Sequence, residues 1–264
     1  MSLPLCRSRS PLFKELLSSS KRKRFLDYPV FRLLLRLRCA IHDQFLNHGE
    51  LPLPPALLRY RVSESLSIPT FLLIGERCAQ LITTHLGPQL LPGSGVRDFG
   101  CGCGRSLRWL LPAYPDVGLD VDPEAIAWCR GTTLPRASRS LPPRKFDAIY
   151  CISVFTHLNE AAQDRYLAML HGLLKPNGVL LFTVHGDNAA KSLRPQQHED
   201  LISSGFLHLT STKLRGIVPP NYHTTWHTEP YLAARLAPHF PRVEYHVILD
   251  GVQDVVLAYM STHS

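Results

Sequence analysis

The sequence contains no apolar run long enough to cross a membrane. Its longest apolar stretches, such as residues 71–75 and 178–183, fall far short of the ~20 residues that a membrane-spanning helix needs. The N-terminal residues MSLPLCRSRSPLF also lack the apolar core of a secretory signal. We therefore expect a soluble protein of the cytoplasm.

The cysteine pattern excludes a disulfide framework and a zinc site. The chain has seven cysteines, an odd and scattered set, and Cys101 and Cys103 lack the second close pair that a structural zinc site requires. His223 and His227 stand four residues apart, but no third ligand of matching spacing accompanies them. We expect reduced thiols and no bound metal.

Acidic residues are scarce only near the N-terminus. The net charge is +8, and residues 1–60 hold eleven Lys and Arg against four Asp and Glu, whereas residues 61–264 hold eighteen against seventeen. A nearly neutral main body does not offer the basic surface that nucleic acid requires, so we expect no nucleic-acid partner. Residues 7–38, with the run KRKR, leave open a weak contact with a membrane or another acidic surface.

Composition and hydrophobic spacing divide the chain into three segments. Residues 1–24 are rich in Ser, Lys and Arg and are expected to form a basic, flexible tail. Residues 25–90 predict a helical segment, and residues 91–264 the main domain. The first expected helix, at 30–45, can lie on a membrane surface or cover the main domain as a lid, and we favour the lid. The expected apolar faces are Phe31, Leu34, Leu35 and Cys39 in this helix, and Phe71, Ile74, Cys78, Leu81 and Ile82 in a second helix at 68–86.

Beyond residue 95, short apolar segments alternate with helical ones. This alternation predicts an α/β fold, a doubly wound and mostly parallel sheet with helices on both faces. Near the end, RVEYHVIL and DVVLAYM are separated by the turn residues DGVQ. Two such strands in succession predict an antiparallel hairpin that completes the sheet.

Three glycines follow the first expected strand. Gly100, Gly102 and Gly104 can fold a tight turn whose amides approach a ligand, since a doubly wound sheet binds ligands beyond the ends of its strands. Asp120 lies twenty residues after Gly100, at the end of the second strand, where it can accept from ribose hydroxyls. Arg105 stands where a dinucleotide fingerprint needs its third glycine, so the observed spacing is D-x-G-x-G-x-G.

This spacing, with Asp120, the alternating body and the terminal hairpin, resembles the class I S-adenosylmethionine-dependent methyltransferases. The segments DFGCGCGRSLRWL, FDAIYCISVFTHL and PNGVLLFTVHGD are similar to a bacterial branch labelled type 11/12. The resemblance implies a seven-stranded Rossmann-like sheet and S-adenosylmethionine as cofactor, with S-adenosylhomocysteine as product. The implied cofactor-binding residues are Asp98, Gly100, Cys101, Gly102, Gly104, Asp120, Val121, Asp122 and Ser153. Among these, Asp122 can alternatively have only a structural role, as the cap of the next helix.

Histidines near the expected strand ends are candidates for the acceptor side. We expect a small or medium-sized acceptor, methylated at oxygen with a histidine as general base, because an alcohol or phenol needs a base of near-neutral pKa. His185 is the preferred base, and each histidine can also have a purely structural role. The other candidate catalytic residues are His157, His223 and His227, and the candidate substrate contacts are Tyr222, Trp226 and Phe155.

Two alternatives from other classes stay open. A methyltransferase-like subunit can be non-catalytic and serve only for binding. A membrane- or nucleic-acid-associated methyltransferase can be guided by the basic N-terminus. The intact Asp98, glycines and Asp120 favour the enzyme.

Overall fold

A computed structural model describes most of the chain beyond the basic N-terminal residues. The described residues are 29–44, 52–111, 114, 118–132, 137–140, 144–210, 214–218, 222–248 and 252–261. The expected tail of residues 1–24 lies outside this part of the chain. Among the described helices, none is both long and apolar enough to cross a membrane.

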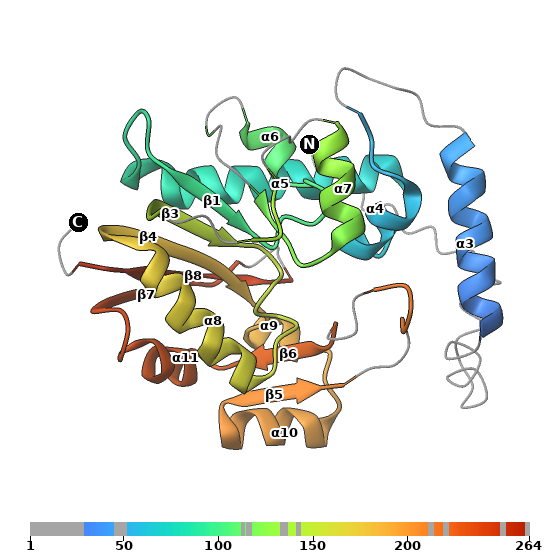
Figure 1. Cartoon of the computed structure of the whole chain (residues 1–264). Coiled ribbons are helices and arrows are strands. Elements are labelled where there is room, and N and C mark those ends of the chain that lie inside the picture. The colour runs from blue at the N-terminus through green and yellow to red at the C-terminus, as the bar shows by residue number, and fades with distance from the viewer. Residues whose placement is uncertain are drawn as a thin grey trace, which may run out of the picture.

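The centre of the molecule is a mixed sheet with the strand order β2-β1-β3-β4-β8-β7 (Figure 1). The first four of these strands run parallel, and β8 pairs antiparallel with both β4 and β7. The expected α/β class and the terminal hairpin are therefore confirmed. The strands are β1 Val96–Phe99, β2 Gly118–Leu119, β3 Phe146–Cys151, β4 Leu174–Val184, β7 Arg242–His246 and β8 Asp254–Tyr259.

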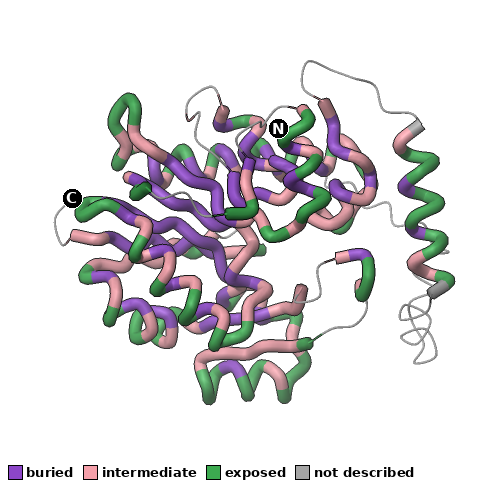
Figure 2. The backbone as a smooth tube through the Cα atoms, in the orientation of Figure 1, coloured by how far each residue is buried: buried purple, intermediate pink, exposed green. Residues whose placement is uncertain are grey.

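Alternating side chains of the sheet enter two separate cores. Leu180 and Phe182 of β4 pack with α8 and α11, whereas Val179 and Leu181 pack with α5 and α6 on the opposite face. This period of two is what a strand buried on both faces produces, and Figure 2 shows the central strands buried along most of their length. The helices of these two layers are α5 Ile68–Leu86, α6 Leu107–Leu110, α8 Glu160–Leu173 and α11 Glu229–Leu236.

The sheet has six strands in the described residues instead of the seven expected. In the position of the missing strand, Ser138 forms an isolated parallel bridge with Leu119. The amide of Asp120 donates to the Ser138 carbonyl over 3.1 Å, and the amide of Ser138 donates to the Gly118 carbonyl over 2.9 Å. In the described part of the chain, residues 137–140 thus pair with the outer edge of β2 through one bridge.

The segment between β4 and α11 contains regular structure in much of its described part. It contains α9 Asp187–Ala190, α10 Pro195–Ser204, β5 Phe206–Leu209 and β6 Thr224–His227. The strands β5 and β6 pair antiparallel in a small second sheet. Trp226 and His227 therefore lie on β6, whereas Tyr222 and His223 precede this strand.

The expected helical segment 25–90 divides into two parts with different roles. Helix α5 has the predicted bounds, and Ser67 caps it by accepting from the Thr70 amide; it packs against the main sheet. Helices α3 Pro29–Gln44 and α4 Ala56–Ser63 instead pack on the turn 214–218. Of the predicted inner face of α3, Leu35 and Cys39 are buried, but Leu34 is exposed.

Candidate active site

A large cavity opens beyond the ends of β1, β2 and β3. Its volume is about 1240 Å³, which exceeds the ~300–1000 Å³ typical of small-molecule sites. The position agrees with the rule that ligands of doubly wound sheets bind beyond the carboxyl ends of the strands. The lining comes from α4, the glycine turn (98–103), the segment after β2 (119–125), the segments 152–154 and 157–158, the turn 215–218, and Tyr222 with His223.

The glycine turn has a backbone that side chains would disrupt. Gly100, Gly102 and Gly104 have φ angles of 90°, 52° and 80°, in the left-handed region that favours glycine. A Cβ on Gly100 would approach the Val154 side chain to 2.3 Å. The amide of Gly100 donates to the Leu119 carbonyl over 2.7 Å. The turn is thereby held against the end of β2, and Gly100 and Gly102 line the cavity.

Two carboxylates lie beside this turn. Asp120 accepts from the Gly102 amide over 2.7 Å and from the Asp122 amide over 2.8 Å, and burial raises its pKa. Burial also raises the pKa of Asp98 to about 8. Both carboxyl groups line the cavity together with Cys101 and Val121. The predicted cofactor residues are therefore brought together, and a ligand with hydroxyl and cationic groups would match them.

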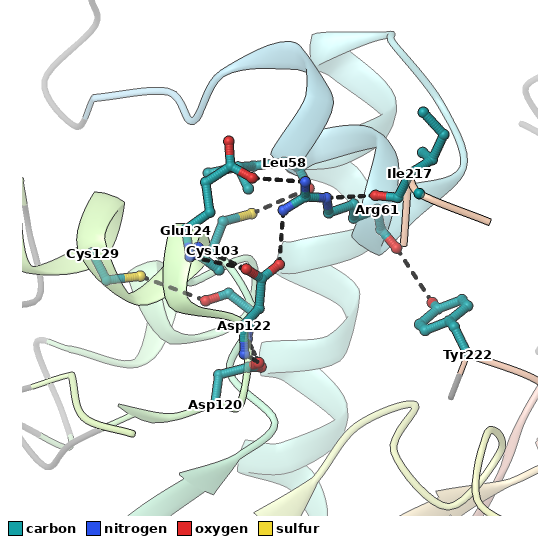
Figure 3. Close-up of polar contacts among 12 residues, drawn as sticks. Leu58, Arg61, Cys103, Asp120, Asp122, Glu124, Cys129, Ile217 and Tyr222 are labelled. Carbon is teal, nitrogen blue, oxygen red and sulfur yellow. Dashed lines mark hydrogen bonds and ion pairs between the residues drawn. The ribbon is translucent and has the colours of Figure 1, made fainter. Parts of the chain in front are cut away.

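Asp122 caps a helix and also binds Arg61 of α4 at the wall of the cavity. Its Oδ1 accepts from the amides of Glu124 and Ala125 at the start of α7 Pro123–Gly131. Its Oδ2 accepts from Arg61 Nη1 of α4 over 2.9 Å. Figure 3 shows the Arg61 guanidinium reaching Asp122, Glu124 and the Ile217 carbonyl together. We call this set of contacts the Arg61 latch.

The latch joins segments that are far apart in sequence. Arg61 Nη2 lies 2.7 Å from Glu124 Oε2, and Nε donates to the Ile217 carbonyl over 2.7 Å. Tyr222 also donates its hydroxyl to the Arg61 carbonyl over 3.3 Å. A single side chain therefore connects α4, the start of α7 and the turn 214–218. We call α3, α4 and this turn the roof.

Replacing Arg61 by methionine is expected to loosen the roof while the main sheet stays folded. Methionine keeps the apolar stem but loses three charge-assisted or carbonyl contacts, and each such hydrogen bond contributes about 1–3 kcal/mol. Hydrogen exchange should show faster exchange of amides in α4 and 214–218, by about tenfold or more. Arg77→Met, on the exposed side of α5, is the matched control. Unchanged exchange in Arg61→Met would show that the latch does not hold the roof.

Ser153 lies two residues beyond the end of β3 and lines the cavity. It has a φ of 59°, which is rare for a residue with a side chain. Its amide donates to Thr183 Oγ1 over 2.8 Å, and its hydroxyl donates to Gln253 Oε1 over 3.0 Å. These bonds fix the backbone of Ser153 at the cavity wall. Gln253 thus supports the site from the terminal hairpin.

His157 lines the cavity, as does His223 among the other candidate histidines. Its Nδ1 lies 2.5 Å from the His223 carbonyl oxygen, so this nitrogen carries the proton and Nε2 is left as an acceptor. Its ring stacks on Tyr222, with 3.7 Å between ring centroids. Burial lowers the pKa of His157 to about 4 and raises that of Tyr222 to about 12. Both rings are neutral near pH 7 and line the cavity.

Four other candidates do not line the cavity. Phe155 is buried in the core against Phe182, and Trp226 packs with Leu201 and Leu207. His185 Nδ1 bonds to the Thr225 carbonyl over 3.0 Å, and burial lowers its pKa. His227 is fully buried against Gln163, which bonds to its Nε2, and burial lowers its pKa to about 3.

Sequence reasoning missed the residues of the roof that line the cavity. Leu58, Arg61 and Val62 come from α4, and the turn 215–218 comes from a segment more than 150 residues later. Leu58, Arg61 and Val62 lie in the segment LPPALLRYRV, whose sequence does not indicate that it contacts a turn so far along the chain. Within the described residues, no three His, Cys, Asp or Glu side chains gather as metal ligands.

Comparison with known proteins identifies the region around this cavity. Residues 98–180 match a family model described as a methyltransferase domain. An uncharacterized protein of Rickettsia prowazekii (strain Madrid E) is 26% identical over 149 residues, which cover 49% of this chain and 60% of that protein. The cyclopropane-fatty-acyl-phospholipid synthase of Escherichia coli (strain K12) is 28% identical over 149 residues, covering 53% of this chain and 39% of the synthase. The match thus spans less than two thirds of either relative.

Solved structures agree in fold. The glycopeptide N-methyltransferase MtfA, complexed with S-adenosylhomocysteine, has a TM-score of 0.51 at 17% identity and covers 71% of this chain and 90% of its own. Magnesium protoporphyrin IX methyltransferase from Synechocystis PCC 6803, with bound S-adenosylhomocysteine, has a TM-score of 0.51 at 15% identity, covering 77% and 93%. The resemblance to class I S-adenosylmethionine-dependent methyltransferases is therefore confirmed: residues 98–180 match a methyltransferase domain, and the sheet around them has the fold of these solved methyltransferases.

Proposed function

We propose that this chain transfers a methyl group from S-adenosylmethionine to the oxygen of a small or medium-sized acceptor. The observation that carries the proposal is one cavity that joins the Gly100–Gly102 turn and Asp120 to His157. A volume of about 1240 Å³ leaves space for a cofactor and an acceptor together. The solved neighbours crystallised with S-adenosylhomocysteine support the choice of cofactor.

The residues of the turn fit the cofactor. When bound, S-adenosylmethionine supplies an electrophilic methyl group on a sulfonium. The glycine backbone and Asp98 would hold its methionine part, and Asp98, which burial alone leaves protonated near pH 7, would ionise beside a cationic amino group. Asp120 would accept from the ribose hydroxyls. Ser153, fixed by Thr183 and Gln253, would line the wall beside the sulfonium.

His157 would receive the proton of the acceptor. As the oxygen of the acceptor bonds to the methyl carbon, its O–H proton would pass to Nε2 of His157, while Nδ1–H keeps donating to the His223 carbonyl. The bond between the methyl carbon and sulfur would break, and S-adenosylhomocysteine would leave. Tyr222, with a raised pKa, remains a neutral phenol and would orient the imidazole by stacking. The roof would exclude water and align the two reactants, which is the main requirement of an in-line displacement.

Calorimetric titration of S-adenosylmethionine and S-adenosylhomocysteine tests the cofactor site. We expect the full chain to bind both in the micromolar range and Asp120→Ala to bind at least about tenfold more weakly, a difference of ~1.4 kcal/mol. Glu199→Ala, an exposed acid on α10, is the matched control and should bind like the parent chain.

The outcome also separates the enzyme from the alternative of a non-catalytic subunit. Absence of binding by the parent chain, with no copurified cofactor, would overturn the proposal and favour the subunit. If Asp120→Ala binds the cofactor as tightly as the parent chain, another residue must hold the ribose. Product analysis with a labelled methyl group would then distinguish oxygen from nitrogen as the accepting atom.

A further inference from the structure

The outer face of α3 carries a row of exposed apolar side chains. The row consists of Val30, Leu33, Leu34, Leu37 and Ile41, whose exposed fractions lie between 49% and 58%. The spacings of three, four, seven and eleven residues from Val30 place all five on one side of a helix. We call this row the outer face of α3. In Figure 2 the helix is mostly exposed, with short buried turns.

The opposite side of α3 already has a partner. Leu35 and Cys39 are buried against Ala56 of α4 and Ile217 of the roof turn. Arg32 and Arg36 donate to the carbonyls of Arg215 and Gly216 on the same side. The helix is therefore anchored by its inner side. It lies at the edge of the molecule in Figure 1, and the side chains of its outer face are exposed.

Exposed apolar side chains concentrate on this one helix. Twelve large hydrophobic residues are exposed in the described part of the chain, and five of them fall within the sixteen residues of α3. Single exposed hydrophobic residues need no explanation, but a contiguous row marks a surface that another body covers. The remaining seven are spread over the other elements.

Charge indicates what covers the outer face. Residues 1–44 contain ten Lys and Arg against three Asp and Glu, a net charge of +7. One of the three acids, Asp43, is engaged by the Ala56 amide and lies 3.9 Å from Arg59, whereas Arg38 and His42 are exposed. Two copies of this helix facing each other would bring two such positive charges together. An apolar face flanked by basic residues is complementary to a layer of anionic lipid headgroups.

We propose that the outer face of α3 docks this protein on the surface of an anionic bilayer. The apolar row enters the boundary between headgroups and acyl chains, and Arg38 contacts lipid phosphates. This docking does not depend on the proposed methyl transfer. It would bring the bilayer against the roof, because the inner side of the same helix forms part of it.

Vesicle flotation of the full chain tests the docking. We expect binding to vesicles of mixed phosphatidylcholine and phosphatidylglycerol, little binding to phosphatidylcholine alone, and a decrease as salt rises. The double variant Leu33→Glu/Leu37→Glu should bind at least about tenfold more weakly. Ile202→Glu, at an exposed apolar position on α10, is the matched control and should bind like the parent chain. Circular dichroism and melting curves should be unchanged in both variants.

Three results would overturn the proposal. The first is absence of binding to the anionic vesicles at low salt. The second is equal binding by the parent chain and by a folded Leu33→Glu/Leu37→Glu variant. The third is a concentration-dependent dimer that the same variant dissociates, which would assign the outer face to a second copy of this chain. If the double glutamate variant fails to fold, Leu33→Gln/Leu37→Gln takes its place and should also weaken vesicle binding.

Discussion

Replacement of His157 by glutamine is expected to lower kcat by about 10²–10⁴-fold. Glutamine retains an amide that can donate to the His223 carbonyl, but it provides no basic nitrogen in place of Nε2. Calorimetry should show nearly unchanged binding of S-adenosylmethionine, because Asp120 and the glycine turn are untouched. The loss should therefore appear in kcat.

The matched control for His157→Gln is His208→Gln. His208 bonds through Nδ1 to Thr225 Oγ1 over 2.8 Å and is absent from the cavity lining, so its replacement should leave kcat within a few-fold. A His157→Gln variant of full activity would exclude His157 as the base. A large loss in both variants would indicate that the region around Thr225 is disturbed as a whole.

The low pKa of His157 predicts how the proposed reaction should depend on pH. Burial holds this pKa at about 4, below the ~6.5 of an unperturbed histidine. The neutral form that accepts a proton therefore persists above pH 4, and kcat/KM should fall only as the pH approaches 4. The same shift affects folding: the unfolded chain takes up the proton more readily, so this contribution to stability is complete above pH ~6.5 and is lost as the pH falls toward 4.

Alanine at Gly75 is expected to destabilise the fold by about 2–3 kcal/mol. Gly75 faces the start of α6, and a Cβ there would lie 2.4 Å from the Arg105 carbonyl oxygen and 3.0 Å from Trp109 Nε1. A backbone carbonyl cannot move aside without displacing the glycine turn that precedes it. Thermal unfolding should show a decrease in Tm of roughly 5–10 °C.

Gly172→Ala is the control for this effect. Gly172 lies in α8, and a Cβ at this position would meet no atom within 4 Å. Since alanine favours helix by up to ~1 kcal/mol over glycine, this variant should melt at the same or a slightly higher temperature. If Gly75→Ala is as stable as Gly172→Ala, α5 and α6 can move apart without lowering the free energy of unfolding.

Local patterns were sufficient to predict the main sheet and the cofactor side of the site. Helix α5 has the bounds that its apolar spacing indicates. The glycines and Asp120 meet because the ends of β1 and β2 are neighbours in any parallel sheet with this connection. The antiparallel hairpin followed from two strands with a short turn between them.

The acceptor side could not be predicted in the same way, because it depends on contacts between distant segments. His157 and His227 look equivalent in the sequence, yet one lines the cavity and the other is buried against Gln163. The pairing of β5 with β6 decides this, and strands of only four residues, FLHL and TTWH, are too short for a clear alternation of apolar and polar residues. Arg61 was missed because its partners Asp122 and Ile217 lie on other elements.

The roof also has a consequence for the order of events during synthesis. Arg32 donates to a carbonyl that follows it by 183 positions, and Arg36 to one that follows it by 180. At ~5–20 residues per second, a ribosome needs roughly 10–35 s to make that intervening chain. During this interval the carbonyls of Arg215 and Gly216 do not yet exist, so α3 cannot form these bonds. The roof can therefore assemble over the cavity only after strands β1 to β4 have been made.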